Sequence, residues 1–97
     1  MTRRAKVALY GNAVYVYAID PAIPKAVLGP RGNYVRAVYD EYSRRISREG
    51  AIRGYGEAGN ALLEQMLELA DRVAVARNVG AVRGPSTEKV IGTIGLQ

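Results

Sequence analysis

Residues 6–19, KVALYGNAVYVYAI, contain the clearest structural signal in the chain. Apolar side chains alternate on both sides of Gly11-Asn12, a dipeptide that favours the tight turn of a β-hairpin. Two antiparallel strands are therefore predicted over this segment. Because side chains two residues apart share a strand face, Tyr15 and Tyr17 should lie side by side on one face of the hairpin.

The next strong pattern begins at Asn33, after two prolines that interrupt the hairpin pattern and a short strand predicted over residues 25–28. The side chain of Asn33 can accept hydrogen bonds from the first amides of a helix. Apolar side chains then recur at spacings of three and four residues, which would place them on one helical face. A first helix is therefore predicted from Tyr34 to Arg48, with three arginines in its last turn and Gly50 ending it.

The second half of the chain predicts a second helix, whose apolar face is unusually broad. The elements predicted after Gly50 are a short strand over 51–53, a helix over 60–72, a turn at 83–86 and a final strand over 87–96. Residues 73–82 could continue the helix briefly or form a strand, and a strand is favoured for their later part. The predicted order of elements is therefore ββ, β, α, β, α, β, β, an α/β fold of the α+β type.

The composition fits one globular domain without the residues on which most enzymes rely. Ninety-seven residues, 48% of them hydrophobic, suit a single domain over residues 1–97. The chain has no His and no Cys, so the common metal ligands, thiolates and neutral-pH proton carriers are missing. We therefore expect no enzymatic activity, no cofactor and no small-molecule substrate.

The charge balance favours a polyanionic partner. Lys and Arg number 14 against 9 Asp and Glu, which gives a net charge of +5. Such an excess attracts phosphate polymers or anionic membranes, and the planar guanidinium of Arg binds phosphate through paired hydrogen bonds. No segment approaches the roughly 20 consecutive apolar residues that span a bilayer. A cytoplasmic location, no membrane partner and a nucleic-acid partner are the resulting expectations.

Residues 54–59 read GYGEAG, which matches the G-x-G-x-x-G pattern of dinucleotide-binding turns. Too few residues follow for the further strand and helix units that such a domain needs. A sharp turn that glycine permits is the simpler interpretation, although a small nucleotide-binding domain stays open. Glu64, Glu68 and Asp71 share one face of the second predicted helix, which indicates a solvated surface rather than a metal or catalytic site.

Basic residues in the predicted loops form the candidate binding set. Arginines in or beside glycine-containing turns can contact phosphates, a tyrosine beside them can stack on a base or sugar, and glycines expose backbone amides to phosphate oxygens. The predicted nucleic-acid-binding residues are Arg31, Arg53, Gly54, Tyr55, Gly56 and Arg83.

The stretch from Lys25 to the C-terminus resembles the Alba family of archaeal chromatin proteins. Two pieces carry the resemblance, namely Asn33-Tyr34-Val35 after a glycine-containing loop and the run from Ile52 to Val73. The resemblance implies a β-α-β-α-β-β two-layer core over residues 25–97, here preceded by the hairpin of residues 1–24 as an extension. It also implies dimerisation and non-specific binding of DNA or RNA.

The resemblance assigns roles to the candidate residues, and this sequence also differs from the family pattern at two points. The family binds with a basic loop before its first helix, matched here by Arg31, and with the turn before its second helix, matched by Arg53 and Tyr55. A β-hairpin arm, matched by Arg83, is the third contact. Pro30 stands where a Lys would be expected, and the arm is short.

Two hypotheses from different classes follow. In the first, a homodimer binds DNA or RNA without sequence preference, and it is associated with the nucleoid if the ligand is DNA. In the second, the chain is a protein-interaction or assembly module without nucleic-acid binding. Its contact residues would be Tyr10, Tyr15 and Tyr17 of the hairpin, because tyrosine is enriched at interfaces.

Overall fold

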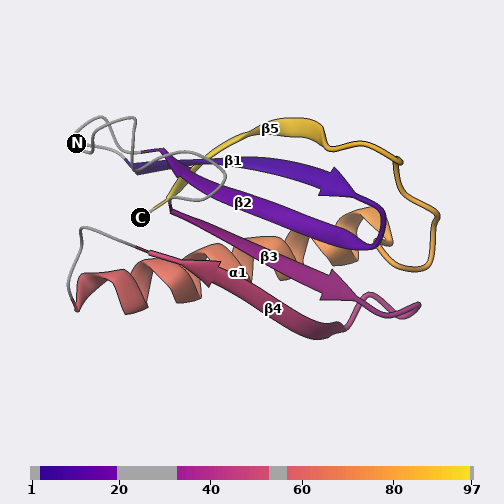
Figure 1. Cartoon of the computed structure of the whole chain (residues 1–97), viewed down its shortest axis with the longest axis horizontal. Helices are drawn as coiled ribbons and strands as arrows, with labels where there is room; N and C mark the ends of the chain where they lie inside the picture. The colour runs from indigo at the N-terminus through magenta and orange to yellow at the C-terminus, as the bar shows by residue number, and fades with distance from the viewer. Residues whose placement is uncertain (1–2, 20–32, 53–56, 97) are drawn as a thin grey trace.

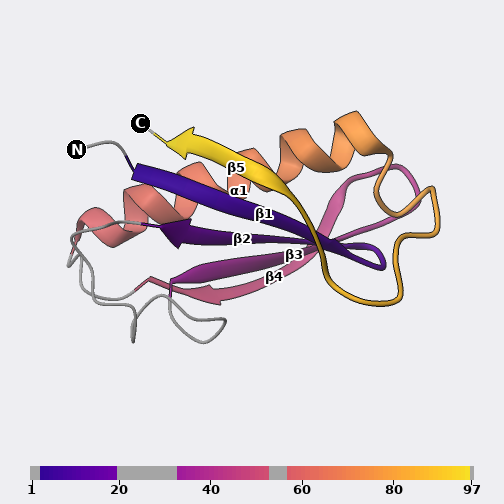
Figure 2. The same ribbon diagram turned by 90° about the horizontal axis from the view of Figure 1, so that it is seen from above.

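The computed structural model describes residues 3–19, 33–52 and 57–96. Its elements, in chain order, are β1 (Arg3–Tyr10), β2 (Ala13–Ile19), β3 (Tyr34–Tyr39), β4 (Arg45–Ala51), α1 (Ala58–Arg77) and β5 (Lys89–Leu96). The strands form one antiparallel sheet in the order β4-β3-β2-β1-β5, and α1 lies against one face of it (Figures 1 and 2). The fold is α+β, which confirms the predicted class at this level.

The predicted hairpin is confirmed, and it forms the middle of the sheet. β1 and β2 pair around a turn at Gly11 and Asn12, with Val7 opposite Val16. Gly11 has φ 56°, a left-handed conformation that glycine adopts readily. β1 also pairs with β5, and β2 with β3. The hairpin therefore adds two interior strands to the sheet rather than projecting from it.

The helix predicted from Tyr34 to Arg48 is wrong, because this segment forms a second hairpin. β3 pairs with β2 on one side and with β4 on the other. Val35, Ala37 and Tyr39 of β3 are buried and alternate with less buried residues, so the period is two. Asn33 is buried just before β3 instead of capping a helix. The strand β2 beside this segment supplied a pairing partner that the local apolar spacing does not reveal.

The side chain of Asp40 shapes the turn between β3 and β4. Its Oδ1 accepts hydrogen bonds of 2.9 Å from the amides of Tyr42 and Arg44, and its Oδ2 accepts one of 3.0 Å from Nε of Arg44. These donors, the Arg44 amide first, lower the pKa of Asp40. An aspartate that bonds nearby amides in this way competes with helix formation. Two strands occupy the segment in which the Alba resemblance implies the first helix, so the β-α-β-α-β-β order is not confirmed.

The second predicted helix is confirmed as α1, and it extends beyond the predicted 60–72. Leu62, Met66 and Ala70 are buried on the side that packs against the sheet. The helix ends where Asn78 adopts a left-handed conformation with φ 53°. Within the described part of the chain, no helix has the length and apolar character needed to cross a membrane.

The remaining sequence predictions have mixed outcomes. β5 confirms the final strand, whereas the strand predicted late in residues 73–82 is wrong because only an isolated bridge joins Val79 and Val82. Of the short strand predicted over 51–53, only Ala51 belongs to a described strand, as the last residue of β4. The strand predicted over 25–28 lies outside the described residues.

Candidate functional site

Most of the predicted binding set falls outside the described residues. Arg83 is described, and it is exposed in the segment between α1 and β5. The predicted residues outside the described ranges are Arg31, Arg53, Gly54, Tyr55 and Gly56. The candidate site must therefore be built from Arg83 and from the cations that the fold brings near it.

Four arginines on the β3 and β4 side of the sheet are each opposed by a carboxylate. The ion pairs are Arg36 with Glu49 at 3.9 Å, Arg44 with Asp40 at 3.0 Å, Arg45 with Asp71 at 3.8 Å, and Arg48 with Glu64 at 3.8 Å. All four are at least partly exposed, so each adds little to stability. The last two ion pairs join β4 to α1. Arg44, Arg45 and Arg48, which were predicted in the last turn of a helix, therefore lie in a turn and in an edge strand.

Three other cations gather around a pocket where α1 ends and β5 begins. Arg77, Arg83 and Lys89 line this pocket of about 280 Å³, and none of its described lining residues is acidic. None of the three takes part in the ion pairs found among residues 3–19, 33–52 and 57–96. We call Arg77, Arg83 and Lys89 together the cationic end.

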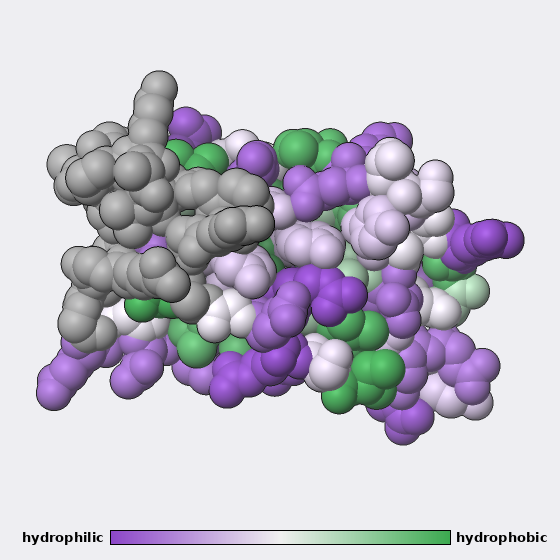
Figure 3. Space-filling model, in the orientation of Figure 1, coloured by the Kyte–Doolittle hydropathy of each residue, from purple (hydrophilic) through white to green (hydrophobic). Residues whose placement is uncertain are grey.

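Hydrogen bonds to its backbone carbonyls hold the connection between α1 and β5, which carries Arg83. The amide of Gly11 donates a hydrogen bond of 2.9 Å to the carbonyl of Pro85, which joins this segment to the β1–β2 turn. Ser43 Oγ donates one of 2.8 Å to the carbonyl of Val79, which joins it to the β3–β4 turn. Figure 1 shows both turns and the α1–β5 connection at the end of the molecule opposite the two termini. In Figure 3, hydrophilic residues project from this end, with pale and hydrophobic residues between them.

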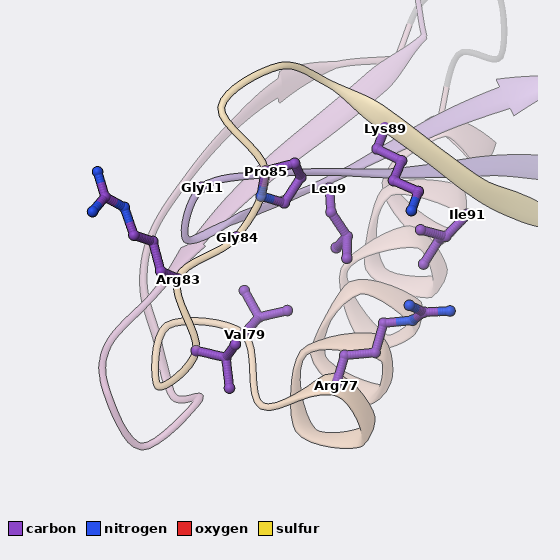
Figure 4. Close-up of a pocket in the computed structure, with 10 residues that line it drawn as sticks. Leu9, Gly11, Arg77, Val79, Arg83, Gly84, Pro85, Lys89 and Ile91 are labelled. Atoms are coloured by element: carbon purple, nitrogen blue, oxygen red, sulfur yellow. The ribbon is translucent and has the colours of Figure 1, made fainter.

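The three cations point in two directions. Figure 4 shows Arg77, from the last turn of α1, and Lys89, from the start of β5, directed to the same side of the α1–β5 connection. Arg83 projects away from them on the other side. A ligand that contacts all three cations must therefore extend around the connection.

The carboxylate of Glu88, next to Lys89 in sequence, is held by a tyrosine. Tyr17 donates a hydrogen bond of 2.5 Å from its hydroxyl to Oε2 of Glu88. Its neighbours Val16 and Ala18 belong to the core under α1, so Tyr17 points to the opposite face of the sheet. Burial, followed by the contact with Glu88, raises the pKa of the Tyr17 hydroxyl above its ordinary value. This bond places the Glu88 carboxylate against Tyr17, and Glu88 forms no ion pair with Lys89 in the described residues.

The tyrosines proposed as interface residues have different environments. Tyr15 and Tyr17 share a strand face as predicted, with ring centroids 6.1 Å apart and planes inclined by 12°. Nε of Arg36 donates a hydrogen bond of 3.0 Å to the Tyr15 hydroxyl. Tyr17 is only 6% exposed, whereas Tyr10 at the end of β1 is 44% exposed. Their contact with a partner chain stays a prediction, for which Tyr10 offers the most accessible ring of the three.

No family model, curated protein or solved structure matches this chain. The cationic end must therefore be interpreted from its own geometry. Within the described residues, no three acidic side chains are grouped so that they could hold a metal ion. Glu64 and Glu68 are exposed and Asp71 is partly exposed, in agreement with the predicted solvated face, and Glu64 and Asp71 also pair with arginines of β4.

Proposed function

We propose that the protein binds nucleic acid through the cationic end, without chemistry and without base-specific contacts. The observation that supports this most is the separation of charges. Four arginines face carboxylates, whereas Arg77, Arg83 and Lys89 surround a pocket without an acidic lining residue among those described. A clustered set of unopposed cations is the electrostatic footprint of a phosphate-binding surface.

The directions of the cations favour a polymer over a single phosphate. Arg77 and Lys89 can contact one phosphate group together, and Arg83 on the other side of the connection can contact another. Repeated phosphates along one strand meet this requirement. The homodimer implied by the Alba resemblance stays a prediction, and it would give each particle two cationic ends.

A charge-removal experiment tests this function. The variant Arg77→Gln/Arg83→Gln/Lys89→Gln should bind a fluorescently labelled 20-nucleotide DNA or RNA about 30- to 100-fold more weakly than the unaltered protein at low salt. The loss is expected because none of these three side chains forms an ion pair within the described part of the chain, so that each substitution removes a charge available to the ligand. Fluorescence anisotropy gives the dissociation constants, and thermal unfolding shows whether the variant is folded.

A matched control separates a local site from net charge. The variant Arg36→Gln/Arg45→Gln/Arg48→Gln also loses three positive charges, but each of these arginines faces a carboxylate. Its affinity should fall by no more than about threefold. Equal losses in the two variants would mean that only net charge attracts the ligand, and no binding by the unaltered protein would end the proposal.

A further inference from the structure

Two tyrosines are exposed at the same end of the molecule as the cationic end. Tyr10 is 44% exposed and Tyr42 is 69% exposed, while the other described tyrosines are buried or half-buried. Tyr10 immediately precedes Gly11, which lines the pocket of the cationic end, and because Leu9 faces this pocket, the Tyr10 side chain points to the other face of the sheet. Tyr42 lies in the turn whose Ser43 bonds the carbonyl of Val79, another lining residue.

The backbone that carries the Tyr42 ring is held by hydrogen bonds within its turn. Oδ1 of Asp40 accepts the amides of Tyr42 and Arg44, which fixes the backbone on both sides of Ser43. The guanidinium carbon of Arg44 lies 4.9 Å from the centre of the Tyr42 ring. An exposed ring on a fixed backbone loses less conformational entropy when a ligand stacks on it than a ring on a mobile loop would.

We infer that Tyr10 and Tyr42 are base-stacking platforms and that the ligand is a single-stranded nucleic acid. This inference rests on the proposed function, in which the cationic end holds the phosphates. Bases in a duplex are already stacked on each other, so their faces cannot reach a side chain, whereas an unpaired base can stack on an aromatic ring. Cations and exposed rings at the same end of the molecule match both parts of a single strand that passes around this end, its phosphates and its bases.

The test compares single strands with a duplex. The variant Tyr10→Leu/Tyr42→Leu keeps the apolar character of both positions but removes the rings. It should bind labelled dT20 and rU20 about 10- to 50-fold more weakly, and a 20-base-pair duplex less than threefold more weakly. Comparison of the dT20 and rU20 arms shows which sugar is preferred. The conservative variant Tyr10→Phe/Tyr42→Phe keeps the rings and should retain single-strand affinity.

A spectroscopic readout gives independent evidence of stacking. The chain has seven tyrosines and no tryptophan, so its intrinsic fluorescence comes from tyrosine. Unlabelled dT20 should quench the fluorescence of the unaltered protein, and most of this quenching should be absent in the leucine variant.

The outcomes separate this inference from the proposed function. Losses that are equal on single strands and duplex, or no loss on either, would overturn base stacking while leaving phosphate binding by Arg77, Arg83 and Lys89 intact. A wild-type protein that binds neither ligand would overturn both. Retained quenching in the leucine variant would also contradict a stacking role for these two rings.

Discussion

Replacing Tyr39 with alanine is expected to lower the free energy of unfolding by about 3–5 kcal/mol. The ring of Tyr39 is only 1% exposed and is part of the core between β3 and α1. Its hydroxyl donates a hydrogen bond of 2.7 Å to Oδ1 of Asp71 on α1. Alanine would remove both the packing of the ring and this link. Since small domains have total stabilities of about 5–15 kcal/mol, urea unfolding should show a large part of the stability lost.

A phenylalanine variant separates the two contributions of Tyr39. Tyr39→Phe keeps the ring and removes the hydrogen bond, so it should cost about 1–2 kcal/mol. The side chain of Asp71 is 44% exposed, so water can replace the lost donor. Equal costs for the alanine and phenylalanine variants would show that the packed ring contributes little, contrary to the fold described above.

The second large effect is expected at Gly80, which follows the end of α1. Gly80 has φ 91°, and a Cβ atom there would overlap the carbonyl oxygen of Asp40 and lie 2.9 Å from its carbonyl carbon. The backbone at Asp40 cannot easily retreat, because hydrogen bonds within the β3–β4 turn fix it. Gly80→Ala should therefore cost about 2–4 kcal/mol and lower the melting temperature by roughly 10–20 °C.

Gly95 in β5 provides the matched control for this substitution. A Cβ atom at Gly95 would have no other atom within 4 Å. Gly95→Ala should therefore change the stability by less than about 0.5 kcal/mol. Equal melting temperatures for Gly80→Ala and Gly95→Ala would refute the close approach of the α1–β5 connection to the β3–β4 turn.

Strong local signals predicted the first hairpin, α1 and β5, while the segment after Asn33 needed tertiary information. Val35 and Tyr39 fit the spacing of a helix as well as that of a strand, and pairing of β3 with β2 decided between them. The available clue was Asp40, followed by Ser43, because aspartate and serine bond nearby backbone groups in turns. A single sequence does not disclose which neighbouring strand will offer a partner.

The candidate site was predictable only in part. Arg83 stood out because it precedes a glycine and a proline in a loop. Arg77 and Lys89 were missed because their proximity depends on where α1 ends and where β5 begins. Asn78, a residue that often ends helices in a left-handed conformation, was the signal that could have placed Arg77 in the last turn. The carboxylates that oppose Arg45 and Arg48 are on α1, and no local pattern predicts such pairs.

The salt dependence of nucleic-acid affinity tests the central claim most directly. Three phosphate contacts at the cationic end of each chain predict that log K falls with log salt concentration with a slope of about −2 to −3. In the Arg77→Gln/Arg83→Gln/Lys89→Gln variant, the slope should approach zero, while the Arg36→Gln/Arg45→Gln/Arg48→Gln variant should keep the slope of the unaltered protein. An unchanged slope in the first variant would contradict phosphate binding at this end.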